Sequence, residues 1–365
     1  MMIDALVAAA VARRASDVHL RAGQPPQVRV NGALERWTDF AVLSHEDIDA
    51  LVTRLLTADQ EEQLDRSQEV DLAWVFPGIG RCRASVFRQR GTLAIALRLI
   101  PATVPTLADL GLPASVARLV NETRGLVLVT GATGSGKSTT LASIVAAINH
   151  ARAVHILTIE DPIEFLHDDV TAVISQREVG IDVPSYPAGL KSALRQDPDV
   201  ILLGELRDAE TIETALVAAE TGHLVLTTLH TLDAPETINR IVSVFEPHHQ
   251  QQIRHQLARV MRASISQRLL PRADGQGRAL AAEVLVSTPY VRDCIADRDK
   301  TSLLASAIVT GTHEYGMQSF DQAILDLCQS GTVSVDEALR WVTHLEEFKM
   351  RLSGITPGSA AIGRL

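Results

Sequence analysis

The sequence contains few cysteines, and Cys82, Cys294 and Cys328 lie far apart along the chain. No two of them have the C-x2-C spacing that a zinc ribbon requires, which argues against that class of metal site. An odd and sparse set of thiols is typical of proteins in a reducing cytosol. We therefore expect three reduced, partly buried thiols.

Aromatic residues and excess positive charge are also scarce. Aromatics make up 4% of the chain, and 34 basic residues face 44 acidic ones, for a formal net charge of −10. A general nucleic-acid binder needs clustered Lys and Arg for the phosphates and rings for base stacking, so this composition argues against one.

Long apolar runs are absent too. No stretch approaches the 18 or so apolar residues of a membrane-spanning helix. Residues 1–12 are apolar, but Arg13 and Arg14 follow the run, whereas the positive charges of a secretory signal precede it. We expect a cytoplasmic protein whose first residues form an amphipathic helix.

The sequence is otherwise that of a globular protein with two domains. Its 365 residues are 46% hydrophobic and 21% charged, which argues against intrinsic disorder. Patterns in the first third predict a small α+β domain at residues 1–104. Asn31-Gly32 predicts a hairpin turn, and Ser44 with Asp47 predicts a helix start. The predicted elements are helices at 1–12 and 48–56, and strands at 16–20, 27–30, 69–75, 81–89 and 93–100.

A segment rich in proline and glycine follows, and we expect it to act as a linker at residues 105–120. Beyond it, short apolar strands alternate with helical patterns, which predicts a parallel sheet covered on both faces in a domain at 121–365. From about residue 236 the pattern is helical, and 248–267 is the longest predicted helix. The predicted strands are 126–130, 154–159, 200–203 and 224–228, and the helices between them are 138–149, 188–195 and 209–220.

One motif in this second domain carries clear chemistry. Residues 131–138, GATGSGKS, match G-x-x-x-x-G-K-[ST] completely and lie between an apolar strand and a helix. Such a loop cradles phosphates with its backbone N–H groups; Lys137 reaches the β- and γ-phosphates, and the Ser138 hydroxyl is placed for Mg²⁺. The predicted cofactors are ATP and Mg²⁺. The predicted binding residues are Gly131, Ala132, Thr133, Gly134, Ser135, Gly136, Lys137, Ser138 and Thr139.

Acidic residues follow two of the other predicted strands. Glu205 ends an apolar strand at the sheet edge where open-sheet active sites lie, and it could polarise the attacking water or hold the metal through a water. Gly204 stands where many P-loop ATPases keep an Asp. Glu160 and Glu164 follow the strand ending at 159 and could orient Mg²⁺ waters, although such a cluster alone is often a solvated turn.

Two histidines flank the strand at 224–228. Their spacing of seven directs His223 and His230 to opposite faces of a strand, so a metal pair is not predicted. One of them, or Thr228, could contact the γ-phosphate, but a lone histidine beside a strand is more often structural. The residues alone leave the two interpretations open.

Taken together, these boxes resemble the secretion ATPase superfamily of RecA-like motors. The boxes are GATGSGKST (131–139), TIEDPIE (158–164), DPDVILLGELRD (197–208) and TGHLVLTTLHT (221–231). The segments ASDVHL (15–20), GRCRASVFRQRG (80–91) and GMQSFDQAI (316–324) resemble type IV pilus retraction ATPases in particular. The resemblance covers nearly the whole chain, and it implies a PAS-like fold for residues 1–104 and a RecA-like ATPase domain with C-terminal helices for residues 121–365.

The resemblance implies roles for individual residues. Lys137 and Ser138 would bind phosphate and Mg²⁺, and Glu205 would be the catalytic glutamate. Glu160 and Glu164 would form the acidic box near metal and water, with Glu160 and Glu205 reaching Mg²⁺ through water. His230 would lie closest to the nucleotide, with His223 beside it. The N-terminal domain of the family supplies arginines to the phosphates, and the matching positions are Arg81, Arg83 and Arg98.

The family also implies an assembly and partners. We expect a homohexamer that hydrolyses ATP to retract type IV pili in twitching motility. It would be peripheral at the inner membrane through a pilus platform protein, and possibly work with a paralogous pilus ATPase. It would not bind nucleic acid. Residues 289–297 match the C-terminal helix of retraction ATPases weakly, so an accessory paralogue is also considered.

Three alternatives remain at this point. The first is a pilus-extension or type II secretion ATPase, which usually carries a tetracysteine zinc motif that this sequence lacks. The second is a RecA-like nucleic-acid motor, which the net charge disfavours. The third is a protein that binds ATP without hydrolysis, which the presence of Lys137 and Glu205 disfavours.

Overall fold

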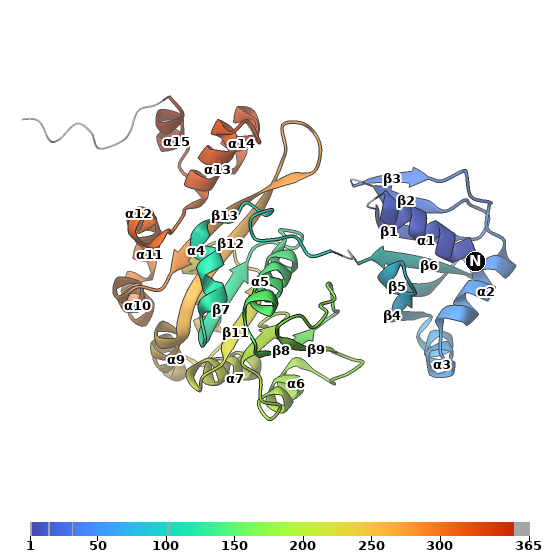
Figure 1. Cartoon of the computed structure of the whole chain (residues 1–365), viewed down its shortest axis with the longest axis horizontal. Helices are drawn as coiled ribbons and strands as arrows, with labels where there is room; N and C mark the ends of the chain where they lie inside the picture. The colour runs from blue at the N-terminus through green and yellow to red at the C-terminus, as the bar shows by residue number, and fades with distance from the viewer. Residues whose placement is uncertain (1, 14, 31, 101–102, 354–365) are drawn as a thin grey trace, which may run out of the picture. The chain divides into compact units, whose positions relative to one another are not determined.

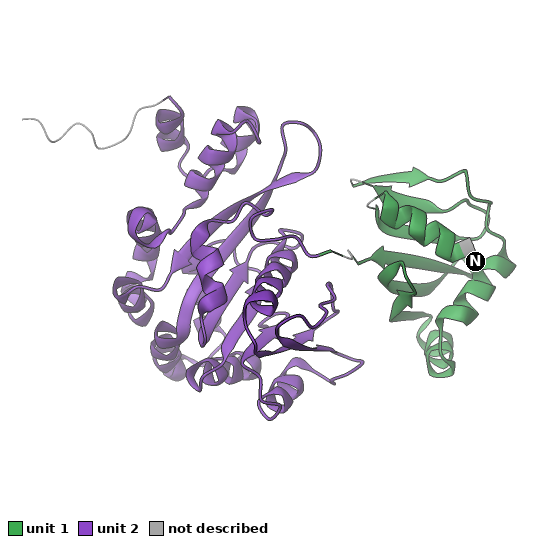
Figure 2. Ribbon diagram, viewed as in Figure 1, with its two compact units in different colours: residues 1–103 green, residues 104–365 purple. Residues whose placement is uncertain are grey.

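The computed structural model describes residues 2–13, 15–30, 32–100 and 103–353. The chain divides into two compact units, Met1–Thr103 and Val104–Leu365 (Figures 1 and 2). Each unit has its own apolar core. Among the described residues, no helix is both long and apolar enough to cross a bilayer. The three cysteines are unpaired, with Cys82 and Cys294 buried and Cys328 half-buried, as expected.

The first unit is an antiparallel sheet with helices packed on it, which confirms the α+β class. Its strand order is β3-β2-β1-β6-β5-β4. The strands are β1 (Ala15–Arg21), β2 (Gln27–Val30), β3 (Ala33–Arg36), β4 (Glu69–Phe76), β5 (Gly80–Gln89) and β6 (Thr92–Leu99). The helices are α1 (Met2–Ala12), α2 (His45–Leu55) and α3 (Ala58–Ser67).

Local signals set the turns and helix starts of this unit. Val30 pairs with Ala33, and Gly32 between them has φ +84°; the predicted Asn31-Gly32 turn lies partly outside the described residues, because Asn31 is not among them. The Ser44 hydroxyl accepts from the Asp47 amide at 3.1 Å, and the Asp47 carboxylate accepts from the Ser44 amide at 2.8 Å. This capping box confirms the predicted helix, which begins three residues earlier than expected. Helix α3 was not predicted.

The second unit is built on a mixed sheet with the strand order β13-β12-β7-β11-β10-β8-β9. All neighbours from β12 to β9 are parallel, and β12 and β13 form an antiparallel hairpin. The strands are β7 (Gly125–Thr130), β8 (His155–Glu160), β9 (Val173–Glu178), β10 (Val200–Leu203), β11 (Leu224–Leu229), β12 (Met261–Pro271) and β13 (Arg278–Val286).

Helices cover both faces of this sheet, as predicted for fully apolar strands. One face packs on α5 (Lys137–Ala151) and α4 (Ala114–Arg118), and alternate residues of the same strands face the helices on the other side. The other helices, in chain order, are α6 (Tyr186–Ala193), α7 (Ala209–Glu220), α8 (Ala234–Ser243), α9 (Pro247–Val260), α10 (Pro289–Ala296), α11 (Leu304–Thr310), α12 (Thr312–Tyr315), α13 (Phe320–Gln329), α14 (Val335–Trp341) and α15 (Leu345–Leu352).

Two of the expectations about this unit were wrong. The helix expected at 248–267 ends at Val260, and the chain continues as β12 beside the P-loop strand β7. The sheet is therefore larger than predicted. The second half of the expected linker is helix α4, which packs on the larger unit: Val116 is fully buried there, and the Ser115 hydroxyl donates to the Gly316 carbonyl at 2.7 Å.

Candidate nucleotide site

The P-loop connects β7 to α5, and its glycines are required by its shape. Gly131, Gly134 and Gly136 have φ of +141°, +79° and +92°, values that residues with a Cβ atom rarely adopt. A Cβ atom at Gly131 would also lie 2.6 Å from the Gln267 carbonyl oxygen of β12. The strand that the sequence did not predict therefore forms the floor beneath the loop.

Lys137 is the first residue of α5, and its side chain turns back over the loop. Its ammonium donates to the carbonyl oxygens of Gly131 at 2.8 Å and Ala132 at 3.1 Å. The residue is 9% exposed, and burial lowers the pKa of the ammonium. The two carbonyl oxygens therefore hold the ammonium over the loop, and a phosphate bound to the loop would compete with them for it.

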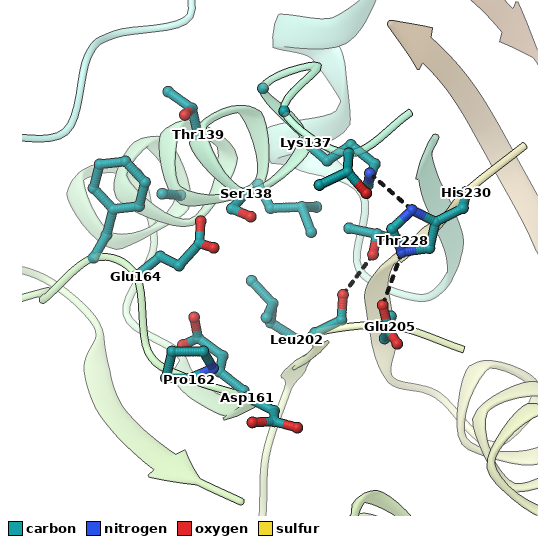
Figure 3. Close-up of a pocket in the computed structure, with 18 of the residues that line it drawn as sticks. Lys137, Ser138, Thr139, Asp161, Pro162, Glu164, Leu202, Glu205, Thr228 and His230 are labelled. Atoms are coloured by element: carbon teal, nitrogen blue, oxygen red, sulfur yellow. Dashed lines mark hydrogen bonds and ion pairs between the residues drawn. The ribbon is translucent and has the colours of Figure 1, made fainter. Parts of the chain in front are cut away.

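A cavity of about 410 Å³ opens beside this lysine (Figure 3). Its walls come from the P-loop, α5, the loop after β8, the ends of β10 and β11, and the β12–β13 hairpin. Of the residues expected from the sequence, it brings together Thr133, Gly134, Gly136, Lys137, Ser138, Thr139, Glu160, Glu164, Glu205 and His230. Gly131, Ala132 and Ser135 do not line it but shape the loop: the Ser135 amide donates to the Ala132 carbonyl at 3.2 Å.

Glu205 follows β10 and is fixed by the neighbouring strand β11. The Thr228 hydroxyl donates to the Gly204 carbonyl at 2.6 Å, and the Leu206 amide donates to the Thr228 carbonyl at 3.1 Å. The Glu205 side chain is 13% exposed and forms an ion pair with Arg207. Its carboxylate also lies 3.0 Å from Nε2 of His230.

His230 connects this carboxylate to the P-loop lysine. Its Nδ1 lies 3.5 Å from the Lys137 ammonium, which can only donate, so Nδ1 accepts and Nε2 carries the proton given to Glu205. Burial, with the positive charges of Lys137 and Arg207, lowers the pKa of His230 and favours this neutral ring. The three side chains form one continuous hydrogen-bonded path (Figure 3).

The two carboxylates of the acidic box differ in their surroundings. Glu160 ends β8, and its Oε1 accepts from the Thr158 hydroxyl at 2.7 Å and the Gln176 amide at 3.3 Å. Burial raises the pKa of Glu160. Glu164 is exposed on the following loop and lies across the cavity from Glu205 in Figure 3.

The structure gives a reason for the glycine at position 204. A Cβ atom there would lie 2.5 Å from the hydroxyl oxygen of Tyr186, the first residue of α6. Tyr186 lines the cavity, and burial, together with the negative charges of Asp161 and Glu160, raises the pKa of its hydroxyl. A neutral phenol thus occupies the space where an Asp side chain would begin.

Some expected site residues lie elsewhere. His223 precedes β11 whereas His230 follows it, and the Nδ1 of His223 lies 2.9 Å from the Ala218 carbonyl oxygen. The expectation that His223 lies beside His230 was therefore wrong, because a whole strand separates them. Arg81, Arg83 and Arg98 belong to β5 and β6 of the first unit, where Arg83 pairs with Asp71 and Arg98 with Asp17, both at 3.1 Å.

Sequence reasoning missed other residues of the cavity. Arg278 begins β13, lines the cavity, and donates to the Gly134 carbonyl of the P-loop at 3.2 Å. Nothing in the sequence linked it to Gly134, because its segment was expected to be helical. Tyr186, Phe165 and His167 also line the cavity and belong to no recognised box.

Comparison with known proteins agrees with this geometry. A family model described as Type II/IV secretion system protein matches residues 1–340. A crystal structure described as the pilus retraction motor PilT with bound ADP superposes with a TM-score of 0.87, at 42% sequence identity, and covers 95% of this chain and 98% of that one.

Two curated relatives come from Pseudomonas aeruginosa. The type IV pilus retraction ATPase PilT is 42% identical over 338 residues, which are 93% of this chain and 97% of the relative. The type IV pilus ATPase PilU is 37% identical over 352 residues, which are 96% of this chain and 91% of the relative. The similarity thus extends over both units.

Proposed function

The chain belongs to the family of type II/IV secretion system proteins and is a P-loop ATPase, and from that premise we propose that it drives the retraction of type IV pili. The observation that carries the proposal is similarity over nearly the full length of both chains to a retraction ATPase and to the crystal structure of a retraction motor. The absence of C-x2-C pairs from the sequence supports retraction over extension.

The side chains of the cavity suit the steps of hydrolysis. We assign the β- and γ-phosphates to the loop amides and Lys137, which exchanges its carbonyl partners for phosphate oxygens. Glu205 orients the attacking water as its general base, and His230 donates to the same carboxylate and holds it in place. His230 therefore connects the phosphate-binding lysine to the catalytic glutamate.

The residues also suit Mg²⁺, which prefers oxygen ligands and keeps several of its waters. The Ser138 hydroxyl and the carboxylates of Glu160 and Glu205 are such ligands, and all three residues line the cavity. Bound there with ATP, the ion would neutralise charge on the phosphates. Ser138 would contact it directly, and the two glutamates would act through its waters.

We further propose a homohexamer in which Arg81, Arg83 and Arg98 of the first unit act on the phosphates. Guanidinium groups stabilise the charge that develops in phosphoryl transfer, so hydrolysis would depend on the position of the domain that carries them. The motor would work in the cytoplasm, at the inner membrane, on a pilus platform protein. The acidic composition agrees with a protein partner rather than nucleic acid.

Deleting the gene and counting surface pili tests this proposal. A retraction motor predicts more pili than in the parent strain, restored to normal by the wild-type gene but not by Glu205→Gln. Glu213→Gln, an exposed position on α7, is the matched control and should restore the count. Loss of pili on deletion would instead identify an extension motor.

An accessory role is the second candidate, because the relative named PilU matches 96% of this chain. In that case deletion alone would leave the number of pili unchanged. Pili would accumulate only when a second retraction ATPase is also weakened.

A further inference from the structure

The edge strand β9 of the larger sheet contacts the acidic box through two side chains. Gln176 and Glu178 both point from β9 onto the loop that follows β8. The Glu178 carboxylate accepts from the Ile163 amide at 3.2 Å, and Glu178 itself is buried. Neither residue lines the cavity, and neither belongs to a box recognised in the sequence.

Gln176 contacts this loop at three points. Its Nε2 donates to the Phe165 carbonyl at 2.8 Å and to the Glu160 carboxylate at 3.3 Å, and its Oε1 accepts from the His167 amide at 2.9 Å. Since a backbone N–H can only donate and a carbonyl can only accept, these partners fix which way the amide faces. The Nε2 group therefore points at Glu160.

The strand register explains how one side chain reaches both ends of the loop. β8 and β9 are parallel, and Thr158 lies opposite Gln176. Thr158 and Gln176 therefore approach the same Oε1 atom of Glu160, one from each strand. Two donors direct a carboxylate that ends a strand, while the far side of the amide holds the loop carrying Glu164.

The contacts matter because Glu160 is buried beside other charges. Burial raises its pKa, the negative charge of Glu164 raises it further, and the donors Thr158 and Gln176 lower it. The other titratable groups on the cavity wall are Lys137, Asp161, His167, Tyr186, Glu205, His230 and Arg278.

We propose that Gln176 is a positioning residue of the ATPase site, whose amide orients the Glu160 carboxylate and ties it to the loop that carries Glu164. This inference rests on the proposed role of Glu160 near metal and water. Gln176 itself does not touch the nucleotide. It acts through Glu160, so its loss should lower turnover more than ATP binding.

The test is steady-state ATP hydrolysis at one fixed pH by the full chain carrying Gln176→Met or Gln176→Glu. Met keeps the length of the side chain without the amide; Glu keeps an acceptor for the His167 amide, loses both donated bonds and adds negative charge. We expect kcat to fall roughly tenfold or more in both variants, and further in Gln176→Glu, because the amide no longer directs the Glu160 carboxylate. KM for ATP should change less than kcat.

Two controls separate this role from a structural one. Gln250→Met removes a half-buried amide on α9 that donates to the Phe245 carbonyl, and its kcat and KM should match those of the wild type. An unchanged kcat in a folded Gln176→Glu protein, or equal losses in kcat and in ATP affinity, would overturn the inference. Thermal melting of each variant establishes folding, and if Gln176→Met fails to fold then Gln176→Glu alone decides.

Glu160→Gln keeps the proposed function distinguishable from the inference. If this variant retains the wild-type kcat, Glu160 lacks its proposed role. If kcat falls in Glu160→Gln, a positioning role predicts that adding Gln176→Met lowers it little further. If the two losses multiply instead, Glu160 keeps its role and Gln176 does not position it.

Discussion

His230 lies between a cation and a carboxylate, and its protonation state sets what it can do. A neutral ring accepts from Lys137 on one nitrogen and donates to Glu205 on the other, whereas a protonated ring would confront the lysine with a second positive charge. Because its pKa is lowered, the neutral form prevails at neutral pH. Each residue of the path therefore depends on the next.

The first prediction concerns Glu205. Glu205→Gln keeps the size of the side chain but removes the base, so ATP binding should persist while kcat falls by about 10² or more. Steady-state turnover and the affinity for a fluorescent ATP analogue measure the two effects. Glu213→Gln on α7 should leave both unchanged. Turnover at the wild-type rate in Glu205→Gln would disprove the assignment.

Arg278 permits a second prediction, because it holds the tip of the P-loop. Its guanidinium donates to the Gly134 carbonyl from the wall of the cavity, close to where phosphates would bind. Arg278→Ala should raise KM for ATP several-fold and change kcat less, since uniform binding is lost. Arg272, on the same hairpin, pairs with Asp274 outside the cavity, and Arg272→Ala is the matched control. A fall in kcat at constant KM would assign Arg278 to the transition state instead.

Among the elements, helix α8 begins on a buried carboxylate of β13. The Glu283 side chain is 8% exposed and accepts from the amide of Ala234, the first residue of α8, at 2.9 Å. Burial, with the nearby charge of Asp233, raises the pKa of Glu283 to about 7, although the Ala234 amide and Arg268 act in the opposite direction. Helix α8, which follows the segment with His230, is thus attached to the sheet through the carboxyl group of Glu283.

This attachment predicts a pH-dependent stability. The pKa of Glu283 is higher in the folded chain than the roughly 4.3 of an unfolded one, so folding favours the protonated form. The stability it contributes is complete below about pH 4 and is lost as the pH rises through 7, by about 4 kcal/mol at most. Glu283→Gln, whose oxygen can still accept from Ala234, should therefore gain stability relative to wild type as the pH rises. Melting temperatures of both proteins between about pH 5 and 8 measure this difference.

The control for this experiment is Glu213→Gln, whose side chain is exposed. Its melting temperature should stay at a constant offset from that of the wild type across the same range. A constant offset for Glu283→Gln as well would contradict the prediction.

The elements found from sequence differ from those missed in how they satisfy their polar groups. β7, β10 and β11 were predicted because they are largely apolar runs, and they are so because every residue in them is buried. β12 contains Ser266 and Gln267, which are buried but paired with Thr130 at 3.1 Å and Thr140 at 2.6 Å. Hydropathy cannot register partners that are more than a hundred residues away. β9 was missed because it lies at an edge of the sheet, where most of its residues are only half-buried and polar ones interrupt the apolar run.

The same reasoning applies to the candidate site. Glu160 ends β8, a predicted strand, and the P-loop and Glu205 come just after two others, so local sequence placed them at one sheet edge. Arg278, Tyr186 and Gln176 reach the site or its loop from distant segments, and only the folded sheet brings them there. His223 was misplaced because spacing along a strand says which face a residue takes but not which end is functional.

At the scale of the whole molecule, both units are predicted to supply residues for ATP hydrolysis. Arg83 and Arg98 lie opposite each other on β5 and β6. The Arg83 side chain is partly exposed and the Arg98 side chain is exposed, and each pairs with a carboxylate of its own unit. Exposed pairs of this kind contribute little to folding, so these arginines can be replaced without unfolding the unit. Their proposed work on phosphate can then be tested in the assembled protein.

We predict that alanine at Arg81, Arg83 or Arg98 reduces turnover more than ATP binding. At least one of the three should lower kcat by about 10² in the full-length protein, because a donor to developing charge is lost. Arg54→Ala, which removes a surface pair with Asp4 in the same unit, is the matched control for folding. Equal losses in kcat and in ATP affinity would favour a role in ground-state binding.

The position of β9 has a mechanical consequence. Over the described residues β9 pairs with β8 alone, and the amides of Ile174 and Glu178 donate to aspartate side chains instead of to a further strand. The Gln176 amide thus lies on a strand that the sheet holds from one side only, and its hydrogen bond to Glu160 depends on that pairing. A displacement at this rim of the sheet would therefore reach the cavity through one side chain.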